Sequence, residues 1–248
     1  MLYLIGLGLN KKGISLEGFE IAKRCKKVYL ENYTVNFPYS VGELSEVLGK
    51  DISELNREEV ENLEFVDFAK KSDVALLVYG SPLIATTHIA ILDECSKSGI
   101  KTKVIHAGSV FDAVAETGLQ FYKFGKVASM PAWNEKKNFT PDSFMEIVKD
   151  NQRAKAHSLI LIDIGLDIQD ALEQLEISAK KYEIKLGKLI VCQSLGTVKQ
   201  KIFYKTFKEF KEDFNAVRKP YCLIIPSGDL HFTEKEYLER FEELYSRE

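Results

Sequence analysis

The sequence predicts an α/β protein of two domains, and three observations lead to this class. Short apolar runs of strand length alternate with longer amphipathic stretches, such as 85–97, through the first half of the chain. The apolar run 74–78 is unbroken, which is typical of a strand buried on both faces of a parallel sheet. Beyond 130–131 the pattern becomes mixed. We therefore expect an amino-terminal domain with a parallel sheet, residues 1–110, and a carboxyl-terminal mixed α/β domain, residues 111–248.

The first half predicts strands and helices in alternation, which favours right-handed crossovers between parallel strands. Thr86 or Thr87 can cap the helix that follows Pro82, because a threonine hydroxyl accepts a hydrogen bond from a free amide of the first turn. We expect strands at 2–6, 27–31, 74–79 and 102–105, and helices at 16–26, 44–48, 56–62, 65–71, 85–97 and 111–118.

The second half predicts a less regular order of elements around a loop at 131–141. Trp133 and Phe139 lie in this loop, where they can contact a protein substrate or cover the core. We expect strands at 126–129, 158–163, 188–193, 201–204 and 221–225, and helices at 141–151, 168–182, 205–210 and 234–246.

Composition argues against several classes of protein. The 248 residues are 45% apolar, which suffices for two cored domains, and the formal net charge is −3 with no basic run longer than two residues. Nucleic-acid binding is therefore disfavoured. No stretch reaches the roughly 18 apolar residues that a membrane span needs, and the chain starts directly in an apolar strand, so we expect a cytoplasmic protein.

The cysteines and histidines are scattered along the chain. None shows the close spacing of a metal site, so we expect no metal and interpret the cysteines as buried apolar side chains. They are Cys25, Cys95, Cys192 and Cys222, with His88, His106, His157 and His231.

Three strand-to-helix turns are candidate ligand sites. They are the glycine turn 6–10, the turn 79–88 and the turn 106–111, and each follows a predicted parallel strand. Open α/β sheets bind ligands at the carboxyl ends of their strands. Ser109 stands at a helix N-cap, whose free amides can also bind a ligand. The alternative, that these turns are purely structural connections, stays open for each of them.

The chain lacks the strong catalytic motifs. A dinucleotide fingerprint would need glycine at position 11, which is Lys11, and there is no Gly-x-Ser-x-Gly elbow, P-loop or glycosidase acid pair. An enzyme without a nucleophile or metal can act by holding two reactants in line. Methyl transfer from a sulfonium donor suits that description.

Five motifs, in this order, resemble the diphthine synthase family of tetrapyrrole-methylase-like (class III) S-adenosylmethionine methyltransferases. They are Tyr3–Leu9, Gly80–His88, Ile105–Val110, Tyr122–Gly125 and Leu230–Glu234. The resemblance implies two α/β domains with the donor in the cleft between them, and a homodimer. It also implies methylation of the amino group of the 3-carboxy-3-aminopropyl side chain on one histidine of translation elongation factor 2, which in archaea yields the trimethylated diphthine.

The resemblance also implies donor contacts at eight positions. Ser81 stands where the family pattern has aspartate, so it can donate a hydrogen bond but lacks the charge that favours a cationic donor. The loop 192–197 lacks the usual arginine, and 227–229 departs from the usual Pro-Gly-Lys. The implied contacts are Leu9, Ser81, Ile84, Ser109, Val110, Ile162, Leu195 and Cys222.

Two other functions stay open beside this one. One is a methylase of the same fold that acts on a tetrapyrrole such as a precorrin, and the other is a donor-binding protein without activity. We assign no catalytic residue, because a structural role is the simpler interpretation of both His88, as a helix-face residue, and His231.

Overall fold

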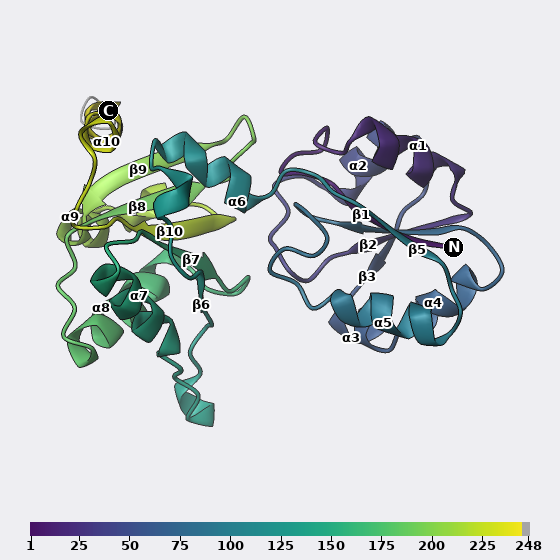
Figure 1. Cartoon of the computed structure of the whole chain (residues 1–248), viewed down its shortest axis with the longest axis horizontal. Helices are drawn as coiled ribbons and strands as arrows, with labels where there is room; N and C mark the ends of the chain where they lie inside the picture. Colours follow the sequence, from purple (N-terminus) through teal and green to yellow (C-terminus); the bar gives the residue numbers. More distant parts are fainter. Residues whose placement is uncertain (245–248) are drawn as a thin grey trace. The chain divides into compact units, whose positions relative to one another are not determined.

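The computed structural model describes residues 1–244 and divides into two compact units (Figure 1). The first is Met1–Ala113 and the second begins at Val114. The sequence placed the boundary between residues 110 and 111. We describe each unit by itself.

The first unit is built on a sheet of five parallel strands. The strand order is β3-β2-β4-β1-β5, and every neighbouring pair runs in the same direction. All five residues of β4 are fully buried, as the unbroken apolar run predicted. The strands are β1 Leu2–Gly6, β2 Lys27–Glu31, β3 Ser53–Leu55, β4 Val74–Val78 and β5 Thr102–Ile105.

Helices cover both faces of this sheet (Figure 1). On one face, Ile5 and Leu77 pack with apolar residues of α1 and α2; on the other, Leu4 and Leu76 pack with those of α3, α4 and α5. Successive strand residues therefore enter opposite cores, as the two-residue period of a strand requires. The helices are α1 Leu16–Arg24, α2 Val41–Leu48, α3 Arg57–Glu61, α4 Glu64–Ala69 and α5 Ile89–Lys97.

The structure of this unit differs from the prediction at β3 and around the start of α5. The edge strand β3 was missed, because its three residues lie in a charged stretch and two of them are exposed. The helix α5 begins at Ile89 and not at Ala85, because Ala85 has a left-handed backbone (φ 55°) that a helix cannot contain. Thr86 does not cap it; its hydroxyl donates to the Pro82 carbonyl oxygen at 2.7 Å.

The second unit contains a mixed sheet of order β6-β7-β10-β8-β9. Only the β6–β7 pair is parallel. The helices α7 and α8 contribute their apolar residues to one core with this sheet. The strands are β6 Ala128–Met130, β7 Ser158–Ile162, β8 Lys188–Gln193, β9 Lys201–Thr206 and β10 Tyr221–Ile225. The α-helices of the second half are α7 Ser143–Arg153, α8 Ile168–Lys181, α9 Phe207–Glu212 and α10 Phe232–Leu244.

The boundaries of several later elements differ from the predictions. The helix expected at 111–118 is the short helix α6, Val110–Ala113, followed by a 3-10 turn, Val114–Thr117. The helix expected from 205 begins at Phe207, because Thr206 caps it with Glu209 in a reciprocal capping box. The last two residues of the helix expected at 234–246 lie outside the described residues. Within residues 1–244, no helix is long and apolar enough to cross a bilayer.

Candidate functional site

Three turns meet at the carboxyl edge of the first sheet. Gly8 and Gly80 exchange backbone hydrogen bonds of 3.2 Å and 3.0 Å across the first two turns. A Cβ atom at Gly6 would lie 2.6 Å from the Gly80 carbonyl oxygen, so the turns approach too closely for any side chain. A Cβ atom at Gly80 would lie 3.7 Å from Ser109, which places the third turn in contact with the second. The turns 6–10, 79–88 and 106–111 therefore lie together at this edge of the sheet.

The side chains of this edge combine hydroxyl groups with accessible apolar groups. Ser81 is buried, and its Oγ lies 3.3 Å from His106 Nδ1. Ile84 is 41% exposed, and Leu9 and Val110 are half-buried. Space stays open where a Cβ atom of Gly108 would stand, because no atom lies within 4 Å of that point. The edge can thus hold a ligand with both apolar and polar parts.

Ser109 is the N-cap of α6, as predicted. Its Oγ accepts a hydrogen bond from the Phe111 amide at 3.2 Å and donates to Asp112 Oδ2 at 3.0 Å. The Asp112 carboxylate also accepts the Ser109 amide at 2.6 Å. Sequence reasoning missed Asp112, although the Ser-x-x-Asp spacing is a recognisable capping signal.

The Tyr79 side chain holds the first turn, residues 6–10, in place. Its hydroxyl donates to the Leu9 carbonyl oxygen at 3.0 Å, and its ring packs edge-on against Phe37 at 5.3 Å between ring centroids. Burial raises the pKa of Tyr79, so the hydroxyl keeps the proton that it donates. This link was not predicted, because nothing in the local sequence pairs residues 9 and 79.

The other three positions at which the family resemblance implies donor contacts lie at one edge of the second sheet. Ile162 ends β7, and Leu195 follows the carboxyl end of β8 in a turn that starts at Ser194 (φ 46°). Cys222 lies in β10 between its partners Leu161 and Cys192. A hydrogen bond with Cys222, together with burial, raises the pKa of the Cys192 thiol, so this cysteine stays protonated and un-ionised. All four cysteines are buried, as predicted.

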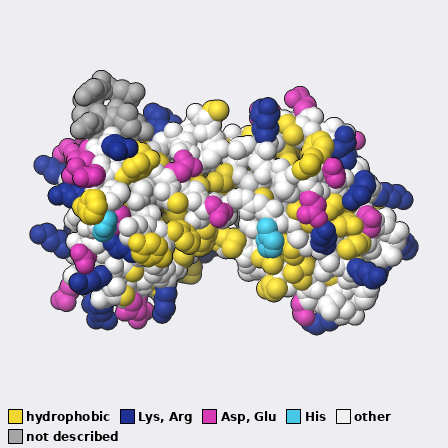
Figure 2. Space-filling view, turned by 45° about the horizontal axis from the view of Figure 1, so that its top comes forward, with side chains coloured by type: hydrophobic (Ala, Val, Ile, Leu, Met, Phe, Trp, Pro, Cys, Tyr) yellow, Lys and Arg dark blue, Asp and Glu magenta, His cyan; other side chains and the backbone are white. Residues whose placement is uncertain are grey.

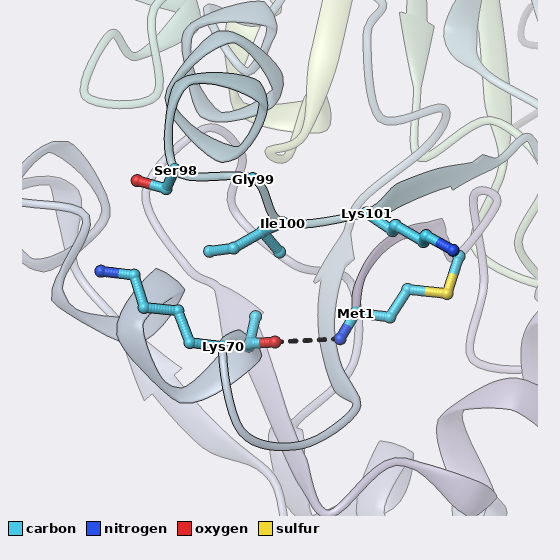
Figure 3. Close-up of a pocket in the computed structure, with 7 residues that line it drawn as sticks. Met1, Lys70, Ser98, Gly99, Ile100 and Lys101 are labelled. Carbon is cyan, nitrogen blue, oxygen red and sulfur yellow. Dashed lines mark hydrogen bonds between the residues drawn. The ribbon is translucent and has the colours of Figure 1, made fainter.

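A pocket at the opposite edge of the first sheet does not belong to this site (Figure 3). It is lined by residues that precede the strands β1, β4 and β5, and the Met1 ammonium group beside it donates to the Ala69 carbonyl oxygen at 3.0 Å. Ligand sites of parallel sheets lie at the other, carboxyl edge.

Comparison with known proteins identifies the family. Residues 1–211 match the family model of Tetrapyrrole (Corrin/Porphyrin) Methylases. The chain belongs to this family. Among relatives of the tetrapyrrole methylase family, the diphthine synthase of Methanocaldococcus jannaschii is 35% identical over 254 residues, which cover 96% of this chain and 97% of that protein. The diphthine synthase of Methanococcus aeolicus is likewise 35% identical over 253 residues, 96% of either chain.

A solved structure gives the same result in three dimensions. A crystal structure of diphthine synthase superposes with a TM-score of 0.87 at 31% sequence identity, covering 97% of this chain and 95% of that one. The chain is therefore an S-adenosylmethionine-dependent methyltransferase of the tetrapyrrole methylase family.

The residues at the carboxyl edge of the first sheet fit the methyl donor. S-adenosylmethionine carries apolar, hydroxyl and charged groups, and this edge offers the accessible side chains of Leu9, Ile84 and Val110 beside the Ser81 hydroxyl and the open space at Gly108. Position 81 carries a hydroxyl and no carboxylate, so this residue offers no negative charge to a cationic ligand.

Proposed function

We propose that this methyltransferase trimethylates the amino group of the aminocarboxypropyl-modified histidine of elongation factor 2. The similarity to diphthine synthases supports this acceptor, because it extends over 96% of the chain and nearly the full length of those relatives. The observation that carries the proposal is the meeting of the turns at Gly8, Gly80 and Ser109, since these turns include three of the motifs that resemble the family.

The proposed donor contacts come from both units of the chain. In the first unit, Ser81 and Ser109 offer polar groups, whereas the other positions offer apolar surface. In the second unit the positions lie at the edge formed by the ends of β7 and β8 and by β10. The proposed contacts are Leu9, Ser81, Ile84, Ser109 and Val110, with Ile162, Leu195 and Cys222.

Methyl transfer requires the protein mainly to orient the donor and the acceptor. The bound donor supplies an electrophilic methyl group on a sulfonium. The chain's residues hold the donor so that a neutral acceptor nitrogen can approach in line, which by itself can lower a barrier by many kcal/mol. The methylated nitrogen loses a proton before each further round, and water can accept it, so the proposal needs no general base.

A transfer assay tests the acceptor. Incubation with donor labelled in its methyl group and the aminocarboxypropyl form of elongation factor 2 should label the factor, and mass spectrometry of the modified peptide should show three added methyl groups. The matched control is the same factor with an unmodified histidine, which should stay unlabelled. Absence of label in the modified factor, with an active diphthine synthase as positive control, would disprove the proposal.

A tetrapyrrole acceptor is the second candidate, because the matched family is described by its action on corrins and porphyrins. A precorrin added to the same assay should remain unlabelled. Labelled precorrin together with unlabelled factor would favour this second function.

We also propose that the protein is a homodimer and works in the cytoplasm beside its translation-factor substrate. Light scattering coupled to gel filtration should give twice the mass of 28.2 kDa. A monomeric mass at assay concentrations would contradict the dimer.

The face in Figure 2 shows Lys and Arg side chains interspersed with acidic ones, which suits a protein partner better than a nucleic acid.

A further inference from the structure

A buried histidine lies directly behind the second turn. His88 precedes α5 and is 1% exposed, and its Nδ1 lies 3.0 Å from the Pro82 carbonyl oxygen. A carbonyl oxygen only accepts hydrogen bonds, so Nδ1 must carry the proton. This contact determines how the imidazole is oriented. The sequence interpretation of His88 as a structural residue agrees with this burial, but His88 is the N-cap of α5 and does not lie on a face of the helix.

The other nitrogen of His88 faces a buried carboxylate. Its Nε2 lies 3.8 Å from Glu31 Oε2 and has no hydrogen-bond partner among the described residues. Glu31 ends β2, is 0% exposed, and accepts hydrogen bonds from the amides of Tyr33 and Thr34 at 3.1 Å and 2.9 Å. The Thr34 hydroxyl also donates to Glu31, at 2.9 Å. The carboxylate is therefore held in place by the chain that follows β2.

These contacts close the second turn into a loop. The Pro82 carbonyl oxygen accepts from both Thr86 Oγ1 and His88, which uses both of its lone pairs. Within this loop the Ile84 amide donates to the Ser81 carbonyl oxygen at 3.1 Å, and Ala85 adopts its left-handed conformation. A left-handed alanine is unfavourable and persists only where its surroundings enforce it.

A buried polar group without a hydrogen-bond partner destabilises a folded protein. The burial of Glu31 and His88 therefore requires an explanation. Glu31 and His88 lie on neighbouring parts of the carboxyl edge, because β2 pairs directly with β4. Two apolar side chains in place of Glu31 and His88 would stabilise the core at least as well as a buried carboxylate beside a nitrogen that lacks a hydrogen bond. What His88 adds is a directed hydrogen bond, which fixes the Pro82 carbonyl group and with it the path of residues 81–88.

We propose that His88 is a positioning residue for the methyl donor: its Nδ1–H holds the loop 81–88 so that Ser81 and Ile84 meet the donor. This inference rests on the donor contacts proposed above at those two residues. It assigns no part in the chemistry to His88, which touches neither reactant.

Four variants of the full-length chain test the role of His88. His88→Leu keeps the volume and removes the hydrogen bond. His88→Asn places an amide nitrogen where Nδ1 stands and keeps the bond, whereas His88→Gln places its amide near the Nε2 position. The matched control is Ile91→Ala, which removes buried apolar volume from α5, the helix that His88 precedes, without touching Pro82.

Two measurements separate positioning from stability. Calorimetry with S-adenosylhomocysteine should show a dissociation constant raised about tenfold in His88→Leu and His88→Gln, but within about threefold of wild type in His88→Asn. Without ligand, hydrogen exchange across 81–87 should be faster in His88→Leu and unchanged in His88→Asn. Ile91→Ala should lower the melting temperature yet leave affinity within about twofold.

Three outcomes would overturn the inference. One is wild-type affinity in His88→Leu, or in His88→Gln if the leucine variant does not fold. Another is an equal loss of affinity in Ile91→Ala, which would mean that binding simply follows stability. If the wild-type protein itself failed to bind S-adenosylhomocysteine, the proposed donor site would fail, and the inference with it.

Discussion

At the scale of single residues, Ser81 determines how much charge the proposed donor site presents. It is buried beside His106, and the family pattern places aspartate at this position. A hydroxyl and a carboxylate both accept hydrogen bonds, but only the carboxylate attracts a sulfonium cation. If Ser81 contacts the donor as we propose, it attracts the sulfonium less strongly than an aspartate at this position would.

Replacing Ser81 by aspartate tests this charge argument. Ser81→Asp should bind S-adenosylmethionine about threefold to tenfold more tightly, because one carboxylate then faces the sulfonium. S-adenosylhomocysteine is a neutral thioether, so its affinity should change by less than about twofold. Calorimetry with both ligands, and Ser81→Asn as the uncharged control, makes the comparison. Equal gains for both ligands would contradict an electrostatic cause.

Tyr79 and Tyr39 are both half-buried tyrosines, but of the two only the Tyr79 hydroxyl makes a hydrogen bond among the described residues. The Tyr79 hydroxyl donates to Leu9, whereas the Tyr39 hydroxyl is buried and finds no partner within residues 1–244. Tyr79→Phe should lower the free energy of unfolding by about 1 kcal/mol and weaken donor binding through the Leu9 turn. Tyr39→Phe should be neutral or slightly stabilising. Urea denaturation measures both, and an equal loss in the two variants would refute the role given to Tyr79.

At the scale of elements, the turns at the carboxyl edge depend on close backbone approach. Gly6→Ala would place a methyl group 2.6 Å from the Gly80 carbonyl oxygen and 2.9 Å from Ala107 Cβ. We expect a loss of about 1–3 kcal/mol and weaker donor binding, because the turns must separate. The control is Gly42→Ala inside α2, where the nearest atom outside the helix backbone is Ser40 Oγ, 3.8 Å from the new Cβ atom. This variant should be neutral or stabilising by up to about 1 kcal/mol. Similar losses in the two variants would contradict the steric argument.

The helix α10 is tied to the segment 120–125 by a buried charged network. Glu234 is 1% exposed and accepts from Lys123 Nζ at 2.7 Å, the Gln120 amide at 2.9 Å and the His231 amide at 2.8 Å. His157 Nδ1 accepts from the Ser227 amide, so its proton is on Nε2, which donates to Glu234 at 3.0 Å. The network joins two of the motifs that resemble the family, and it places His231 as an exposed neighbour of the network.

This network should make the second unit sensitive to acid. Burial lowers the pKa of His157, so unfolding takes up a proton below about pH 6.5. Burial alone would raise the pKa of Glu234, but hydrogen bonds from Lys123 and its other donors outweigh burial and lower it to about 2. Stability from Glu234 is thus present above pH 4.5 and declines as the pH falls toward 2.

The Glu234→Gln variant tests this assignment. Losing the charge should cost about 3 kcal/mol at neutral pH, because Lys123 loses its partner, and should flatten the decline of stability below about pH 4.5. Chemical denaturation at a series of pH values gives both quantities. An unchanged slope in the variant would mean that other carboxylates cause the acid sensitivity.

At the scale of the whole molecule, the proposed donor contacts are divided between the two units. Addition of S-adenosylhomocysteine should therefore slow hydrogen exchange at 81–84 and 109–110 and also at 193–196, in the same concentration range. The pocket-lining segment 98–101 at the opposite edge of the first sheet serves as the internal control and should not change. Protection confined to the first unit would remove Leu195 from the proposed contacts.

The class of the fold, the bounds of many strands and the family could be inferred from the sequence. The strands at 27–31, 102–105, 188–193 and 221–225 have the predicted bounds, because their apolar runs are local and end at clear polar or turn residues. The motifs at the three turns also identified the methyltransferase family, which the comparisons confirmed.

The contacts between residues of different turns could not be inferred from the sequence. The contacts of Gly6 with Gly80, of Tyr79 with Leu9 and of His88 with Pro82 and Glu31 follow from the order of the strands and from the left-handed turn at Ala85. Periodicity reports which face of an element is buried, but it does not say which distant element covers that face. The ligand class could therefore be inferred from local motifs, whereas the packing behind the loop 81–88 required the three-dimensional structure.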